Sequence, residues 1–213
     1  MAITDFGSFG VKEVADVGFY TVGTVKVNAD GTVTATAKPV LTFDTLKVSN
    51  LEFTGETAEA RGGQGNTVLL SWDHSREATL TLEDALLSID SLNTMLSSSD
   101  TTGGEGVAVI NVDANGFPGT YTVVGQTFAR TTDGKDHLLT FVIFKAKVNS
   151  EASLEMTADG DPSTLNMTLK VLRVKEDNEK GMGASKGDMM KFIINKNTSD
   201  NAPSIALPEP QGT

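Results

Sequence analysis

Apolar and polar residues alternate through most of this chain, and that alternation limits the folds open to it. Val25 and Val27 lie on one side of a polar connection that ends in Asp-Gly, and Val33 and Ala35 lie on the other. A period of two is the pattern of strands with one buried face, and Asp-Gly is typical of a tight hairpin turn. The sequence therefore predicts a β-rich domain whose first hairpin turns within residues 28–31.

Further strands are predicted along the rest of the chain. They cover residues 40–53, 68–72, 78–82, 107–112, 121–128, 138–148, 152–156, 165–171 and 190–194. The alternation shifts phase near Asp44-Thr45, which predicts a bulge or bend there. Apolar residues occupy both parities at the start of 138–148, as expected of a central strand covered on both faces.

One helix is predicted, and it begins at Thr81. Thr81 and Asp84 have the spacing of a capping box, with Asp in place of the usual Glu or Gln. Apolar residues then recur at steps of three and four, at Leu82, Ala85, Leu86, Ile89, Leu92, Met95 and Leu96. This stripe predicts a helix that packs against the sheet.

Three stretches predict irregular structure. Gly55–Asn66 has four glycines and almost no large apolar side chain, so it cannot bury enough surface to offset its ordering entropy, and we predict a mobile loop. A turn is predicted at residues 73–75, and a flexible connector at 97–105. The expected organisation is a single domain over residues 1–195 and a flexible C-terminal arm over 196–213.

The composition excludes several function classes. The chain has 213 residues, a length that suits one domain. It has 17 Lys and Arg against 28 Asp and Glu, which gives a formal charge of −11. This balance argues against a surface that wraps nucleic acid or anionic membrane. The absence of cysteine removes disulfides and thiolate chemistry. No apolar block has the length of a signal peptide or a membrane span.

The residues that catalysis would need are few. His74 and His137 are predicted to be solvated turn residues. Asp159-Gly160-Asp161 lacks the further ligands of a calcium loop, so a turn is the better interpretation. Residues 61–65 resemble a phosphate-binding loop in composition only, because no helix and no Lys-Ser/Thr pair follow. Trp72 alternates in phase with two apolar residues, and core packing is favoured over ligand stacking. We therefore predict no enzyme, no cofactor and no metal.

Two parts of the chain carry a resemblance to a known family. The strands and turn from Leu138 to Arg173 resemble the C-terminal hairpin of bacteriophage tail tube (major tail) proteins. The order of pieces in residues 39–48, 59–63, 70–73 and 78–87 is similar to the same group. Together these stretches cover about half of the chain.

The resemblance implies a fold and an assembly. The fold would be mainly β, with two packed antiparallel sheets in a sandwich or barrel-like arrangement, one flanking helix, long loops and terminal arms. Six copies would form a ring, and rings would stack into a tube through which DNA passes without specific binding. Other tail proteins would be partners, such as the tape measure, the baseplate or tip, and a sheath where the tail contracts. The protein would be assembled in the host cytoplasm and end in the virion, with no membrane partner.

Segments that fold only on contact would suit the stacking of rings, because they delay growth until a partner is present. The residues that we expect at the contact between rings are Glu59, Arg61, Gly62, Gly63, Gln64 and Asn66. Acidic walls would let DNA slide, and Glu155 is the candidate for a side chain facing the lumen.

Three other interpretations stay open from the sequence. The chain could be another tail component, such as a tail terminator, or the tube of a related injection machine. It could also be a β-sandwich module that binds carbohydrate or a host surface. That class usually presents an exposed aromatic platform, whereas aromatic residues make up 6% of this chain.

Overall fold

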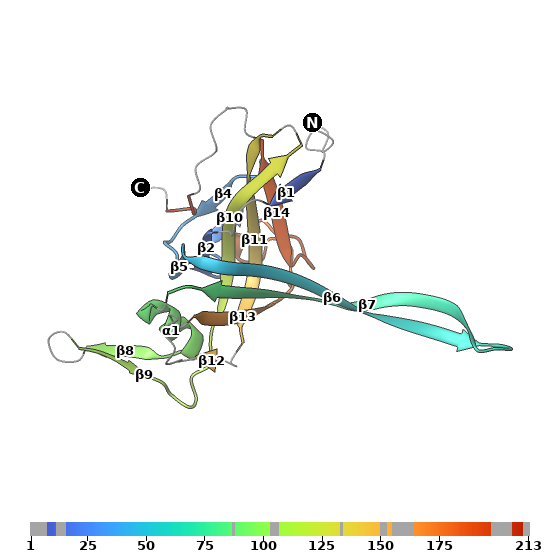
Figure 1. Ribbon diagram of the computed structural model, residues 1–213, viewed down its shortest axis with the longest axis horizontal. Coiled ribbons are helices and arrows are strands. Elements are labelled where there is room, and N and C mark those ends of the chain that lie inside the picture. Colours follow the sequence, from blue (N-terminus) through green and yellow to red (C-terminus); the bar gives the residue numbers. More distant parts are fainter. Residues whose placement is uncertain are drawn as a thin grey trace.

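The computed structural model describes residues 8–11, 16–86, 88–102, 107–132, 134–149, 153–154, 164–196 and 206–210. Within them the chain is mainly β, with a 10-stranded antiparallel sheet, two short hairpins and a single α-helix (Figure 1). The elements in chain order are β1 (Phe9–Val11), β2 (Asp16–Thr21), β3 (Val25–Val27), β4 (Val33–Ala35), β5 (Leu41–Phe43), β6 (Leu46–Gly62), β7 (Thr67–Asp84), α1 (Ile89–Leu96), β8 (Ser99–Thr102), β9 (Ala108–Asn111), β10 (Thr120–Thr131), β11 (Asp136–Val148), β12 (Ser153–Leu154), β13 (Leu165–Val171), the 3-10 turn η2 (Glu179–Gly181) and β14 (Met190–Asn195).

The large sheet is built around two long strands, β10 and β11. Its order is β5-β2-β10-β11-β13-β7-β6, with β1 beside β10, β14 beside β11 and β12 beside β13. β11 pairs with β14 through Leu138–Ile143 and with β13 through Ala146–Val148. Each long strand thus changes partner along its length, and the sheet is shared between two layers.

Both faces of β11 are buried, as the sequence predicts. Phe141 and Ile143 belong to a first core that also contains residues of β2, β5, β7, β10, β13 and α1. Val142 and Phe144 belong to a second core with Tyr20 and residues of β3 and β4. Side chains of a strand alternate between its faces, so a strand inside two cores carries apolar residues on both parities. The prediction of a mainly β fold with packed antiparallel layers and one helix is confirmed.

The second core is covered by the hairpin β3–β4 and by the loop after β13. Val27 donates its N–H to the Met182 carbonyl at 3.0 Å, and Met182 is fully buried. Gly183 follows with φ +71, and a Cβ on it would collide with the Val27 carbonyl oxygen. Only glycine fits this close approach of two backbones. The predicted hairpin at residues 28–31 is confirmed as β3–β4.

The helix lies later in the chain than predicted. Thr81–Asp84 is the end of β7, and α1 begins at Ile89 with Ser88 as its N-cap. The capping box is formed by Ser88 and Ser91, whose side chains bond each other's backbone N–H groups. Thr81 cannot cap a helix because this part of β7 pairs with β6 on one side and β13 on the other.

Two further predictions are corrected by the strands. Ser99–Thr102, in the stretch predicted as a connector, is β8 and pairs with β9. His137, predicted to be solvated, is 4% exposed in β11, and its Nε2 lies 3.1 Å from the Thr131 hydroxyl. The bend predicted at Asp44-Thr45 is confirmed as the break between β5 and β6.

A short C-terminal segment, Ala206–Pro210, lies against the body. Ala206 donates its N–H to the Gln126 side-chain oxygen at 2.9 Å, and the Tyr20 hydroxyl donates to the Pro208 carbonyl at 2.8 Å. A Cβ on Gly18 would lie 3.0 Å from Leu207, so the missing side chain makes room for that leucine. Part of the predicted arm therefore contacts the domain, while the division at residue 195 stays a prediction.

The docked segment predicts a high-pH transition at Tyr20. Burial, and then the nearby charge of Glu209, raise the pKa of Tyr20 to about 12. A raised pKa favours the neutral phenol in the folded state. Below about pH 10, the pKa of tyrosine in the unfolded chain, Tyr20 contributes its full share to the free energy of unfolding. This contribution is lost as the pH rises through about 12, the pKa of Tyr20 in the folded chain. Removing residues 206–213 should shift this titration toward 10, because the charge of Glu209 and part of the burial are lost.

The chain has 2 tyrosines, so the measurement is direct in a Tyr121→Phe background. Tyrosinate absorbance then follows Tyr20 alone, with and without the C-terminal residues. An identical titration in the two chains would contradict the docking of this segment on Tyr20.

Candidate functional site

A two-stranded arm projects from the body of the molecule (Figure 1). β6 and β7 continue beyond the body and stay paired from Thr54 with Glu77 to Gly62 with Thr67 (Figure 1). Residues 54–77 are called the arm below. Eight residue steps of strand give it a length of about 27 Å. Every side chain of β7 from Thr67 to Glu77 is exposed, whereas Ala78 is buried.

The arm corrects the prediction of a loop at residues 55–66. Most of this segment is strand, and only residues 63–66 form a turn, in which Asn66 donates its N–H to the Gly63 carbonyl. Gly63, Gly65 and Asn66 have positive φ, which explains the glycines of the tip. The main-chain bonds to β7 order the segment although its side chains bury little surface.

A bulge lies where the arm leaves the body. The register passes from Thr54 opposite Glu77 to Glu56 opposite His74, so Gly55 faces two residues, Ser75 and Arg76. Ser75 has φ +57. The turn predicted at residues 73–75 is therefore wrong, since β7 runs through it with one extra residue.

The extra residue reverses the side on which the even-numbered side chains of β7 lie. Before the bulge Ala78 pairs with Phe53, and its side chain points into the first core. After the bulge Trp72 pairs with Ala58 and Leu70 with Ala60, on the opposite side of the ribbon. Side chains directly opposite each other share a face. We call this side the tryptophan face, and the side of Phe53 and Arg76 the bulge face.

The tryptophan face is apolar and exposed. Trp72 is 53% exposed and Leu70 67%, and only Ala58 and Ala60 accompany them from β6. Nearer the body the same face carries His74, whose Nε2 lies 3.3 Å from the Glu56 carboxylate. The prediction that Trp72 packs in the core is wrong, because this residue lies in the arm, where every side chain of β7 from Thr67 to Glu77 is exposed.

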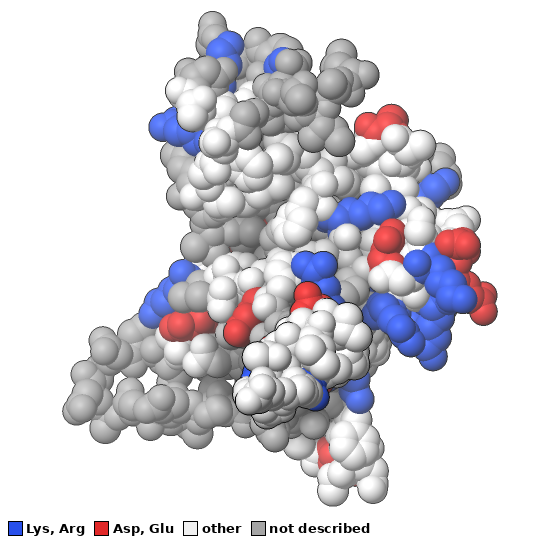
Figure 2. All heavy atoms as spheres, turned by 90° about the vertical axis from the view of Figure 1, so that its right-hand side faces the viewer, with Lys and Arg blue, Asp and Glu red and all other residues white. Residues whose placement is uncertain are grey.

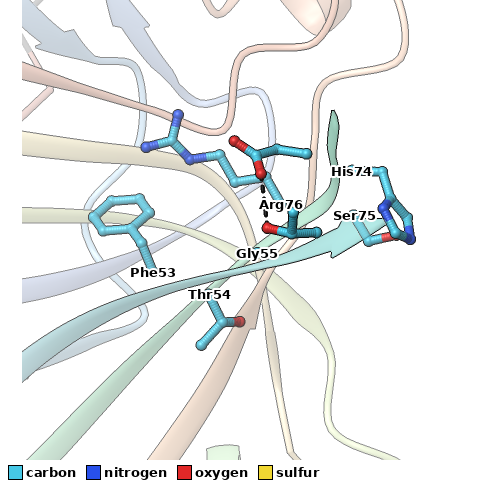
Figure 3. A pocket seen from close by; sticks show the side chains of 8 residues that line it. Phe53, Thr54, Gly55, His74, Ser75 and Arg76 are labelled. Atoms are coloured by element: carbon cyan, nitrogen blue, oxygen red, sulfur yellow. Dashed lines mark hydrogen bonds between the residues drawn. The ribbon is translucent and has the colours of Figure 1, made fainter. Parts of the chain in front are cut away.

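The bulge face is polar and hollowed. An open hollow of about 760 Å³ lies around Gly55, which has no side chain. Phe53, Thr57, Asp73 and Arg76 line it from the bulge face, and Thr54, His74 and Ser75 complete its lining at the bulge. The Arg76 guanidinium lies 5.5 Å from the centre of the Phe53 ring, and the Thr57 hydroxyl donates to Asp73 at 2.8 Å. Figure 3 shows Phe53 and Arg76 on one side of the ribbon and Thr54 on the other.

All the contact residues predicted from the sequence gather at the far end of the arm. Glu59 and Arg61 form an ion pair on the bulge face, Gly62 ends β6, and Gly63, Gln64 and Asn66 form the turn. Glu155, the predicted lumen residue, lies outside the described residues, as does the turn at Asp159-Gly160-Asp161. The residues that sequence reasoning missed are Leu70, Trp72 and Arg76. The sequence signal that could have found Leu70 and Trp72 is the run of large apolar side chains at 68–72, because the preceding segment 55–62 has no large apolar side chain to pack against them.

The outer end of the arm is uncharged, since residues 62–72 contain no Asp, Glu, Lys or Arg. Figure 2 looks at the side to which the arm points and shows a largely uncharged projection with acidic and basic side chains around it. Within the described ranges, no group of three His, Asp or Glu residues could hold a metal ion. The arrangement of the arm suits contact with another surface.

A comparison with protein families agrees with this architecture. The model of the YomU/Tube protein family matches residues 9–103 and 98–185. The chain belongs to this family. The matched ranges contain the arm, the helix and both cores of this tube-family protein, so the family resemblance seen in the sequence is confirmed. The search of curated proteins returned no match. No helix in the described parts of the chain is long and apolar enough to cross a membrane.

Proposed function

We propose that this tube-family protein is the repeating subunit of a phage tail tube. Copies would close into rings, six to a ring as the resemblance to tail tube proteins implies, and the rings would stack into a tube through which DNA passes. The observation that carries the proposal is the arm, which extends outside the core of its own chain and exposes an apolar face.

Such an arm is an incomplete structure by itself. An isolated two-stranded hairpin is marginally stable in water, and sheets gain independent stability when a hydrophobic face is covered. Trp72 and Leu70 are both more than half exposed. Contact with other copies would bury them and hold the arm straight, which supports a role in joining subunits.

Sheet edges offer a second kind of contact. In the strand order of the large sheet, the outermost strands are β5 on one side and β6 on the other. In the part of the chain that is described, β14 pairs with β11 alone. Edge strands present main-chain N–H and C=O groups that can pair with another chain. A ring needs a head-to-tail interface, and edges of different strands supply two unlike surfaces.

The acidic balance suits a duct for DNA. The formal charge is −11, and binding to DNA depends on Lys and Arg that displace counterions from phosphate. A subunit with this charge would let the duplex slide without holding it. The remaining partners would be other tail proteins at the ends of the tube, namely the tape measure, the baseplate or tip, and a sheath in a contractile tail. The site of action would be the virion, after assembly in the host cytoplasm, and the role would require no catalysis.

Electron microscopy of the purified protein tests the proposal. We expect straight tubes of uniform width in negative stain and a concentration-dependent rise in mass by light scattering. Single rings that do not stack would favour a tail terminator instead. A protein that stays monomeric at high concentration, even with the other tail components added, would contradict the proposal.

A further inference from the structure

The arm carries a projecting side chain on one face and a hollow on the other. Trp72 lies opposite Ala58, three residues farther out than Gly55, which is one of the residues that line the hollow. Three strand residues correspond to about 10 Å along the arm. The two features lie on opposite sides of the ribbon, so Trp72 cannot fill the hollow of its own chain.

We propose that the hollow at the bulge receives Trp72 of a second copy of this chain. The inference rests on the proposed function, because the contact is made between assembled subunits. It says which side chain fills the hollow and in which direction the contact runs: each copy inserts Trp72 into one neighbour and receives Trp72 from another neighbour.

The chemistry of the hollow fits an indole ring. Its volume of about 760 Å³ lies within the range of about 300–1,000 Å³ that holds drug-sized molecules, so an indole can enter. The Phe53 ring supplies an aromatic surface, and the Arg76 guanidinium beside it supplies a cation. Tryptophan is the aromatic residue that cations favour most, and aromatic pairs add to it.

The tryptophan face fits the role of the inserting surface. The residue opposite Trp72 is Ala58 and the next apolar pair has Ala60, so small side chains leave the indole standing clear of the ribbon. Trp72 is also the only tryptophan of the chain. Tryptophan is among the residues enriched at the positions that contribute most to binding in protein interfaces.

Opposite faces determine the kind of assembly. An inserting surface and a receiving surface on different sides of one ribbon form a heterologous contact, which repeats from copy to copy and closes only if the rotation allows a ring. Stacked β layers lie about 10 Å apart. The arms of successive copies would therefore lie on one another as layers, each shifted along the next.

Two variants separate the two halves of the contact. Trp72→Ala removes the inserting side chain and keeps the hollow. Gly55→Leu fills the hollow and keeps Trp72; a Cβ at Gly55 meets nothing within 4 Å, so the larger side chain has room. Gly10→Leu is the matched control, since a Cβ there also meets nothing within 4 Å and β1 is outside the arm.

The fluorescence of the single tryptophan is the measurement. In wild-type protein and in the Gly10→Leu control, assembly should shift the emission to the blue and reduce acrylamide quenching several-fold. Gly55→Leu alone should keep the emission of an exposed indole. When it is mixed with Trp72→Ala, its tryptophan is the only one in the sample, and it should shift to the blue as it enters the hollow of the other copy. Insertion from arm to arm should then end after two copies, because one variant lacks the tryptophan and the other lacks an open hollow.

The outcomes distinguish this inference from the proposed function. If the wild type forms tubes while Trp72 keeps the emission of an exposed residue, the inference is wrong and the function stands. If the mixture shows the emission of Gly55→Leu alone, the hollow is not the receptor. If the wild type does not assemble, both fail. Because the chain has no cysteine, a Trp72→Cys copy mixed with a Gly55→Cys copy gives a second readout. A bifunctional maleimide that spans about 10 Å, the spacing of stacked β layers, should cross-link this mixture more than either variant alone.

Discussion

Deletion of residues 56–75 should leave a folded body that no longer assembles. The deletion joins Thr54-Gly55 to Arg76-Glu77, and Thr54 and Glu77 are already a cross-strand pair. The new connection is a two-residue hairpin loop with glycine first, which is the sequence that a type II′ turn requires. None of the deleted residues belongs to either buried core. We expect the free energy of unfolding to change by less than about 1 kcal/mol and tube formation to be lost.

A smaller deletion is the matched control. Replacement of residues 63–66 by Asn-Gly keeps both strands of the arm, the tryptophan face and the hollow, and removes only the turn. We expect this chain to assemble more slowly than the wild type, because it lacks three of the predicted contact residues and keeps the faces. Light scattering against time and negative-stain images compare the three chains. Tubes formed at the wild-type rate by the chain without residues 56–75 would contradict a role of the arm in assembly.

The strands were predictable where the alternation of the sequence reflects burial in the chain's own core. Leu165, Met167, Leu169 and Val171 alternate with polar residues, and the predicted strand 165–171 has the bounds of β13. β11 was predictable for the same reason, since both of its faces meet apolar neighbours. In these strands the alternation of the sequence follows directly from burial in the chain's own core, so the sequence alone was sufficient to predict them.

The helix was misplaced because two periodicities overlap. Leu80 and Leu82 alternate as a strand does, while Leu82, Leu86 and Ile89 recur as in a helix. The pairing of β7 with both β6 and β13 decides for strand up to Asp84. The pairs with β13 join residues more than 80 positions apart in the chain, and local spacing contains no information about them. The capping serines at 88 and 91 then fix where the helix begins.

The candidate site was predicted in position and misread in structure. The composition of residues 55–66 predicts a loop, because their side chains bury little surface. Cross-strand hydrogen bonds to β7 nevertheless hold these residues in the arm. The orientation of Trp72 depends on one extra residue at Ser75, which changes the face of the side chains from His74 to Leu70. A bulge of this kind leaves no mark in hydrophobic periodicity except a shift of phase, which the exposed, irregular pattern of the arm conceals.

Gly125→Val should destabilise the body more than any exposed substitution. Gly125 is buried in the middle of β10 and pairs with Phe141 of β11. A Cβ on Gly125 would collide with the Phe141 ring, which lies across the glycine. Valine has a high strand propensity, so the backbone accepts it, and the cost comes from displacing the ring in a packed core. We expect the free energy of unfolding to fall by about 3 kcal/mol. Gly10→Val, where a Cβ meets nothing within 4 Å, should stay within about 0.5 kcal/mol of the wild type.

The collision can be separated from other effects of the valine by changing its partner. Phe141→Leu withdraws the outer part of the ring, so the double variant Gly125→Val with Phe141→Leu should be more stable than the sum of the single changes predicts. Residues in direct contact show coupling energies of about 0.5–3 kcal/mol in such cycles, and we expect a value in the upper half of that range. Denaturant unfolding of the four chains gives the coupling. A sum without coupling would mean that the ring does not rest on Gly125, and that β10 and β11 are packed differently at the centre of the first core.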